Sequence, residues 1–107
     1  MQQYKCTVLL PRQYNDKTEV LPEVWNVALG RLLDEFGAYT SREFCFGVWI
    51  NSEGIRMVDS LHELFVVVED NDKVVRFKAL VADVFVPLFK QEAIYCEVCP
   101  VDMELIS

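Results

Sequence analysis

Apolar and β-branched residues dominate residues 4–10, whose sequence YKCTVLL is typical of a β-strand. Pro11 ends this predicted strand, because proline has no backbone N–H to continue a hydrogen-bonded ladder. Residues 11–20 (PRQYNDKTEV) are mostly polar, and the Asn15-Asp16 pair within them indicates a turn. The chain therefore opens with a strand that is followed by a polar loop.

A helical period of apolar residues begins directly after that loop. Pro22 marks its start, because proline is preorganised for the first helical position, and Glu23 suits the positive end of the helix dipole. Gly37 marks its end, because glycine readily takes the left-handed conformation that closes a helix. The apolar positions form one stripe for burial: Leu21, Val24, Trp25, Ala28, Leu32 and Phe36.

The middle of the chain is rich in strand-forming residues. Residues 44–50 (FCFGVWI) predict a strand, and residues 38–40 form either a short strand of their own or the lead-in to a longer one. A turn cluster follows at residues 51–54, after which residues 55–58 are expected to return antiparallel to the strand.

A further strand is expected after a short loop at residues 59–62. Residues 63–69 (ELFVVVE) are the most strand-like segment of the chain. A nearly continuous apolar run of this kind suits a central strand that is covered on both faces.

The second helix is expected at about residues 73–90, with Asn71-Asp72 as its N-terminal cap. Two apolar stripes run along different sides of this helix, which predicts burial over most of its surface. One stripe holds Phe77, Leu80, Val81, Val84, Phe85 and Leu88, and the other holds Val75, Ala79, Ala82, Val86 and Phe89. Pro87 should bend or shorten the last turn.

The last predicted strand covers residues 93–101 (AIYCEVCPV), with an interruption at Pro100, and residues 102–106 are expected to extend it as an edge. The order is strand, helix, two or three strands, helix, strand, which is the β-α-β-β-α-β pattern of ferredoxin-like folds. We therefore predict one α+β domain over residues 1–107. It would be a two-layer α/β sandwich with two helices on one face of an antiparallel sheet.

Two helices on one side leave the other face of this sheet uncovered. Residues 64–68 are apolar at every position, so at least part of the uncovered face is apolar too. An apolar patch on a protein surface usually marks an interface or a ligand groove. We expect a homodimer that forms through the open sheet face or through the second helix.

Composition narrows the choice of partners. The 107 residues are 52% hydrophobic and carry a formal charge of -7. A nucleic-acid binder would need clustered Lys and Arg, and anionic membranes would repel this charge, so neither partner is expected. The start, Met1-Gln2-Gln3-Tyr4-Lys5, lacks the pattern of a signal peptide, and a cytoplasmic location is expected.

The cysteines Cys6, Cys45, Cys96 and Cys99 are expected to be reduced in such a protein. Cys96 and Cys99 form a CxxC motif, but a redox pair would open a helix and this pair lies in a predicted strand. Residues three apart on a strand point to opposite faces, which hinders a shared zinc ion or a disulfide. We predict structural cysteines, no metal and no cofactor.

Few residues are candidates for chemistry or ligand binding. His62, the one histidine, lies near Asp59 and Glu63 at a predicted loop-strand junction and is a candidate general base. A capping or solvated role is the alternative, and no Ser-His-Asp or Cys-His arrangement can be argued around it. Aromatic and arginine side chains are candidates for ligand binding, with core and edge packing as the alternative: Tyr39, Arg42, Trp49, Arg56 and Tyr95.

Several segments resemble those of small uncharacterised bacterial proteins that also occur in phages, integron cassettes and other mobile elements. The resemblance rests on Pro11-Arg12, the Asn-Asp loop, the Pro22-Glu23 helix start and residues 91–98 (QEAIYCEV). It covers both ends of the chain and is weak in the middle. It implies a ferredoxin-like fold, and its motifs are structural, so it provides no catalytic residue to carry over.

Three classes of function remain open. The first is a non-catalytic binding or regulatory module that acts as a homodimer, which fits the apolar surface and the lack of a catalytic set. The second is a small cofactor-free enzyme of the dimeric α/β-barrel kind. Its pocket for a small hydrophobic substrate would be lined by His62, Tyr39, Trp49 or Tyr95. The third is an acidic decoy that blocks a nucleic-acid-binding protein, although the acids of this chain are dispersed.

Overall fold

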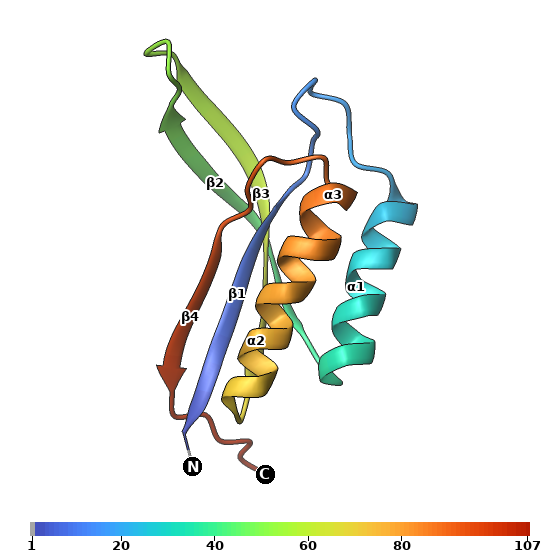
Figure 1. Ribbon diagram of the computed structural model, residues 1–107, viewed down its shortest axis with the longest axis vertical. Helices are drawn as coiled ribbons and strands as arrows, with labels where there is room; N and C mark the ends of the chain where they lie inside the picture. The colour runs from blue at the N-terminus through green and yellow to red at the C-terminus, as the bar shows by residue number, and fades with distance from the viewer. Residues whose placement is uncertain (1) are drawn as a thin grey trace.

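The sheet and the helices form two layers of a ferredoxin-like α+β sandwich, as the sequence predicts (Figure 1). The computed structural model describes residues 2–107, with Glu43 and Phe44 described by their backbone alone. The elements are β1 (Gln3–Pro11), α1 (Pro22–Phe36), β2 (Thr40–Ile50), β3 (Arg56–Val68), α2 (Asn71–Leu80), the π-helical turn η1 (Val81–Phe85), α3 (Val86–Leu88) and β4 (Cys96–Val101). The strand order is β2-β3-β1-β4, and every neighbouring pair is antiparallel.

The core lies between the sheet and the helices. β1 is an inner strand, and its alternate residues Cys6, Val8 and Leu10 are fully buried beneath the helical layer. Phe77 and Phe85 from the second helical stretch fill the space above them and are also fully buried. Burial of large side chains of this kind supplies most of the free energy that favours folding.

The first helix begins and ends where the sequence predicts. Pro22 occupies its first turn, and Gly37 follows its last residue with a φ of 77°, the left-handed conformation that glycine adopts without strain. The Gly37 N–H donates to the Leu33 carbonyl at 2.8 Å, which satisfies one of the free carbonyls at the helix end. Ala28 and Leu32 are its buried residues.

The second helical stretch begins at Asn71, two residues earlier than predicted, so the predicted Asn71-Asp72 cap is wrong, and the stretch is irregular near its end. Asp70 is the N-cap, and its side chain accepts a hydrogen bond from the Lys73 N–H at 2.8 Å. Pro87 lacks the N–H that an α-helix would use to bond the Asp83 carbonyl. The stretch widens there into the π-helical turn η1, in which the Val86 N–H donates to the Val81 carbonyl.

One of the two stripes on this helical stretch is exposed, contrary to the prediction of burial on most sides. Val75 is 64% exposed, and Ala79 and Ala82 are exposed as well, whereas Phe89 from the same stripe is fully buried. The sheet and α1 cover two sides of the stretch, and nothing within the described chain covers this one. None of the described helices has the length and apolar character needed to cross a bilayer.

The two middle strands are longer than predicted. β2 starts at Thr40, so the segment before Phe44 is the lead-in to one strand. β3 is continuous, and the loop expected at residues 59–62 is wrong because Ser60 and Leu61 pair in register with Phe46 and Cys45. An extra residue in β2 between Arg42 and Cys45 forms a bulge, and the register shifts by one residue there.

The last strand is shorter than predicted. β4 begins at Cys96, and residues 102–107 follow it without strand structure. Its ladder with β1 runs from the pair Gln3 and Val101 to the pair Val8 and Cys96. Residues 93–95 therefore approach β1 only near its end, where the Leu9 N–H donates to the Tyr95 carbonyl at 3.1 Å.

The β2–β3 hairpin projects beyond the helical layer because strands and helices differ in rise per residue. The 13 residues of β3 span about 43 Å, whereas the 15 residues of α1 span about 22 Å. Figure 1 shows the hairpin extending well past the ends of α1 and α3. Its apolar side chains consequently have no helix to pack against.

Replacing a core aromatic residue tests this packing. We expect Phe77→Ala to lower the free energy of unfolding by about 3–5 kcal/mol, because it opens a cavity under the second helical stretch. Val75→Ala, on the exposed side of the same helix, should change it by less than about 0.5 kcal/mol. Urea denaturation of both variants measures the difference, and equal losses would contradict the burial pattern.

Candidate functional site

Two adjoining cavities lie where the hairpin leaves the body of the protein. Their volumes are about 320 Å³ and 270 Å³. Both are lined by Pro11, Trp49, Asp59 and Gln91. We call the first the upper cavity, the second the lower cavity and the pair together the hairpin cleft. It is the candidate functional site because it combines a hollow with convergent polar and aromatic groups.

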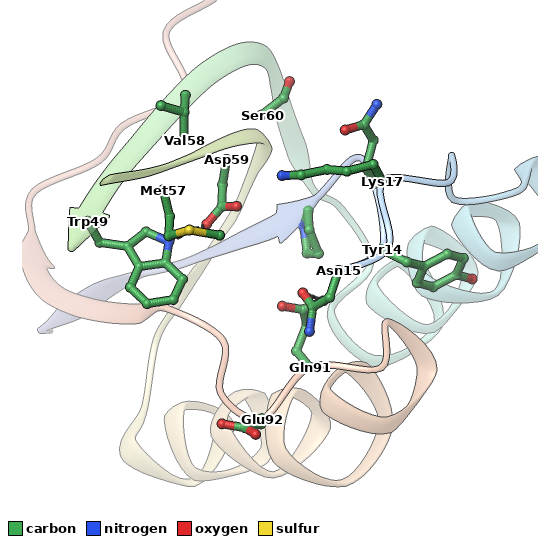
Figure 2. Close-up of a pocket in the computed structure, with 12 residues that line it drawn as sticks. Tyr14, Asn15, Lys17, Trp49, Met57, Val58, Asp59, Ser60, Gln91 and Glu92 are labelled. Carbon is green, nitrogen blue, oxygen red and sulfur yellow. Dashed lines mark hydrogen bonds between the residues drawn. The ribbon is translucent and has the colours of Figure 1, made fainter. Parts of the chain in front are cut away.

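Trp49 and Asp59 form the centre of the hairpin cleft. Trp49 pairs with Met57 across the β2–β3 ladder and Asp59 pairs with Gly47, so both side chains point to the same face of the hairpin. The Trp49 Nε1–H donates to Asp59 Oδ2 at 2.8 Å, which holds the indole ring in place (Figure 2). A Cβ on Gly47 would lie 3.2 Å from the Leu61 side chain, so glycine permits this close packing.

The polar loop after β1 and the segment after α3 close the upper cavity. Figure 2 shows Asn15, Lys17 and Gln91 across the cavity from Trp49 and Asp59. Lys17 has a φ of 70°, a left-handed conformation that turns the loop. Gln91 Nε2 donates to Asn15 Oδ1 at 3.4 Å, which links the two segments.

A short turn next to this wall is held by Asp16. Its Oδ1 accepts hydrogen bonds from the Thr18 N–H at 2.9 Å and from the Thr18 hydroxyl at 2.6 Å. These two hydrogen bonds lower the pKa of the Asp16 carboxyl, because they stabilise its charged form. The turn therefore keeps its shape at neutral pH.

The lower cavity is more apolar. Its walls include Leu9, Leu61, Ile94 and the ring of Tyr95. The Tyr95 hydroxyl donates to Glu97 Oε2 at 2.8 Å. This hydrogen bond and the negative charge of Glu97 raise the pKa of Tyr95, so the phenol stays neutral.

Two of the five predicted ligand-binding residues line the hairpin cleft. Trp49 and Tyr95 both border the lower cavity. The other three lie elsewhere. Tyr39 packs against the core before β2, and Arg56 is exposed at the start of β3. Arg42 forms an ion pair with Glu63 at 3.6 Å on the open face of the sheet.

His62 does not line the hairpin cleft. It lies within β3 and not at a loop-strand junction, so the predicted position is wrong. Its ring lies 4.9 Å from the Trp25 ring, and its Nε2 is 2.5 Å from the Ser41 hydroxyl oxygen. His62 therefore faces the helical layer, and its role as a general base stays a prediction.

The cysteines are free thiols. Cys96 pairs with Val8 and faces the helices, whereas Cys99 pairs with Lys5 and faces the other way. Burial raises the pKa of the Cys6 thiol to about 11 and raises that of Cys96 as well. Within the described part of the chain, no three His, Cys, Asp or Glu side chains gather to hold a metal ion.

Sequence reasoning missed Asp59, Lys17 and Gln91 as residues of the cleft. Asp59 was expected in a loop, and its contact with Trp49 depends on a continuous β3. Lys17 and Gln91 are 74 positions apart and meet only through the fold. The available signal was the alternation of residues 57–61, which would have placed Asp59 on the face of Trp49.

Comparisons with known proteins show the fold and no family. No known protein family matches the chain, and no curated protein matches it in sequence. CutA1 from Oryza sativa is similar in structure, with a TM-score of 0.70 at 11% identity over 98% of this chain and 84% of that chain. The divalent cation tolerance protein (Cut A1) of Thermus thermophilus has a TM-score of 0.67 at 12% identity over 96% and 87%.

A third structure of this fold is a phage SAM lyase in complex with S-methyl-5'-thioadenosine. Its TM-score is 0.60 at 10% identity, over 98% of this chain and 93% of that chain. At such low identity these likenesses show a shared ferredoxin-like arrangement alone. The resemblance to proteins of mobile elements stays a prediction.

The thiols provide a test of this geometry. We expect iodoacetamide at pH 8 to modify Cys6 far more slowly than Cys99 in the folded protein, because Cys6 is fully buried. A pKa of about 11 also leaves only about one thiolate in a thousand at that pH. Mass spectrometry of the alkylated peptides measures both rates. Equal rates in the folded protein would contradict the placement of Cys6, and urea should equalise them.

Proposed function

We propose that this protein is a non-catalytic binding module that works as a homodimer. The hairpin would form the contact between copies, and the hairpin cleft would hold a small ligand. The observation that carries this proposal is the concentration of exposed apolar side chains on the hairpin. An apolar surface of this kind is stable in water when another surface covers it.

The hairpin surface consists of apolar residues that alternate along β2 and β3. Phe46, Val48 and Ile50 are 70%, 62% and 71% exposed, and Val58 opposite Val48 is exposed too. By register these side chains lie on the helical side of the sheet, beyond the reach of the helices (Figure 1). A second copy would bury these apolar side chains, which the helices do not cover.

The centre of the open sheet face is a weaker candidate for the contact. The Lys5 ammonium lies 4.2 Å from the centre of the Phe65 ring, and the Arg42 guanidinium lies 5.8 Å from it. Both cationic groups lie over the Phe65 ring in cation–π contacts and carry their charges on this face. Burying this face would therefore require the removal of water from several charges.

The second helix offers a further apolar strip. Val75, Ala79 and Ala82 are exposed there, and an open groove of about 400 Å³ beside them is lined by Val86 and Ile94. Small side chains provide less apolar area than the aromatic and branched residues of the hairpin. We favour the hairpin for this reason, and the experiment below distinguishes the two surfaces.

Ligand binding in the hairpin cleft is supported by its position and by its walls. Val48 belongs to the hairpin surface and also lines the lower cavity, so a partner on the hairpin would border the cleft. The phage SAM lyase of similar fold was solved with a bound small molecule, which supports the capacity of this arrangement to hold one.

No observation favours the enzyme or the acidic decoy over this proposal. The pocket of an enzyme was expected to be lined by His62, Tyr39, Trp49 or Tyr95, and only Trp49 and Tyr95 line the cleft. A decoy needs a dense acidic stripe. Carboxylates of this chain are instead dispersed and partly engaged, as in the ion pair of Glu35 with Arg76.

A matched pair of charge substitutions tests the proposed contact. Val48→Glu and Val75→Glu place the same charge at positions of similar exposure, one on the hairpin and one on the second helix. We expect the native protein to scatter light at micromolar concentration as twice its 12.4 kDa chain mass. Val48→Glu should raise the dissociation constant at least about a hundredfold, because it places a charge in an apolar interface.

Each result assigns or rejects the contact. Val75→Glu should leave the dimer intact. If Val75→Glu alone dissociates the dimer, the interface lies on the second helix and not on the hairpin. If the native protein is a monomer at these concentrations, the proposal of self-association is wrong. A larger closed assembly sensitive to Val48→Glu would reject the dimer and retain the hairpin. Circular dichroism of both variants confirms that they fold.

A further inference from the structure

The lower cavity has the chemical character of a site for an organic cation. This inference rests on the proposal that the hairpin cleft binds a ligand, and it concerns which ligand. Trp49 and Tyr95, the two aromatic residues that line the cavity, come from β2 and from the segment before β4. They are 50% and 56% exposed, so much of each ring is open to contact.

Each ring is held by a hydrogen bond to a carboxylate. Trp49 donates to Asp59, and Tyr95 donates to Glu97, both at 2.8 Å. The bonds restrict the orientation of the rings, which lowers the entropy that a ligand must overcome. They also place a carboxylate at the edge of each ring, and the aromatic rings and the negative charge both attract a cation.

Asp59 is the one charged residue among those that line the lower cavity. Its neighbours there are apolar, aromatic or uncharged, and Lys17 borders only the upper cavity. In the described part of the chain, the ion pairs join other acids, namely Glu35 and Glu63. None of these ion pairs includes Asp59, whose Oδ2 accepts the indole N–H of Trp49 and which still carries its negative charge toward the cavity.

This lining excludes several other kinds of ligand. A phosphate or carboxylate ligand would be repelled by Asp59 and by the chain charge of -7. A hard metal ion such as Mg²⁺ or Ca²⁺ takes six or more oxygen ligands, and one carboxylate does not supply them. A cation with an apolar surface matches both the rings and the carboxylate.

We propose that the lower cavity binds a small organic cation of the quaternary ammonium type. The charge would lie against the faces of Trp49 and Tyr95 and near Asp59, and the alkyl groups would contact the apolar wall. A cavity of about 270 Å³ accepts a free small molecule of this class.

Choline and its neutral carbon analogue 3,3-dimethylbutan-1-ol provide a matched pair of probes. They have the same shape around the branched centre and differ in charge. We expect choline to shift the NMR signal of the Trp49 indole N–H with saturation, at constant ionic strength. The neutral analogue should bind at least about tenfold more weakly, which corresponds to the usual strength of a cation held against aromatic rings.

Two variants identify the residues. Asp59→Asn keeps an acceptor for the indole and removes the charge, so it should weaken choline about tenfold and leave the neutral analogue unchanged. Lys73→Gln, in the first turn of α2 and outside the hairpin cleft, should leave choline affinity within about twofold. Trp49→Phe assigns the indole signal.

The outcomes separate this inference from the proposed function. Equal affinity for choline and its neutral analogue would reject recognition of a cation, but the cavity would still be a ligand site. No shift with either probe would overturn the inference, whereas the test by light scattering would still decide self-association. If choline binds equally well to the native protein and to Asp59→Asn, Asp59 does not contribute to recognition of the cation.

Discussion

The length of β3 is the constraint on which the rest of the structure depends. A strand advances about twice as far per residue as a helix. In a two-layer fold, a long hairpin therefore extends beyond the ends of the helices that pack on it. The helices shelter the half of β3 that carries Leu64, Val66 and Val68, and these side chains are buried. The other half has no cover within one chain. Its apolar residues are therefore exposed.

The hairpin cleft follows from the same geometry. β1 ends at Pro11, where the ladder with β3 stops at Leu61, and the residues of β3 before that point have no strand on their inner edge. The polar loop after β1 and the segment after α3 approach this gap and leave two cavities between them. The cleft and the exposed hairpin surface are thus neighbours, and Val48 belongs to both.

The sequence predicts the architecture well because local signals and the fold agree. Pro22 and Gly37 bound the first helix as expected, and the order of strands and helices leads directly to the ferredoxin-like sheet. The middle was less predictable. The polar residues of this segment predict a loop, but Asp59, Ser60 and His62 continue β3. Polar side chains are accommodated there because this part of the strand lies outside the core or at its border.

The sequence predicts some residues of the hairpin cleft and misses others. Trp49 and Tyr95 were selected for their chemistry, since large amphipathic rings are common at binding sites. Lys17, Asp59 and Gln91 were missed because their meeting depends on the register of the hairpin and on the path of two distant loops. The sequence also does not predict that the hairpin is exposed, because an apolar strand has the same pattern of apolar residues whether it is buried or exposed.

Hydrogen exchange at two protein concentrations tests the central claim most directly. If copies cover the projecting hairpin, backbone amides of β2 from Cys45 to Ile50 should exchange more slowly in the concentrated sample, while those of α2 and β4 remain the same. Exchange of the hairpin that is independent of concentration, or protection confined to α2 and β4, would contradict the account.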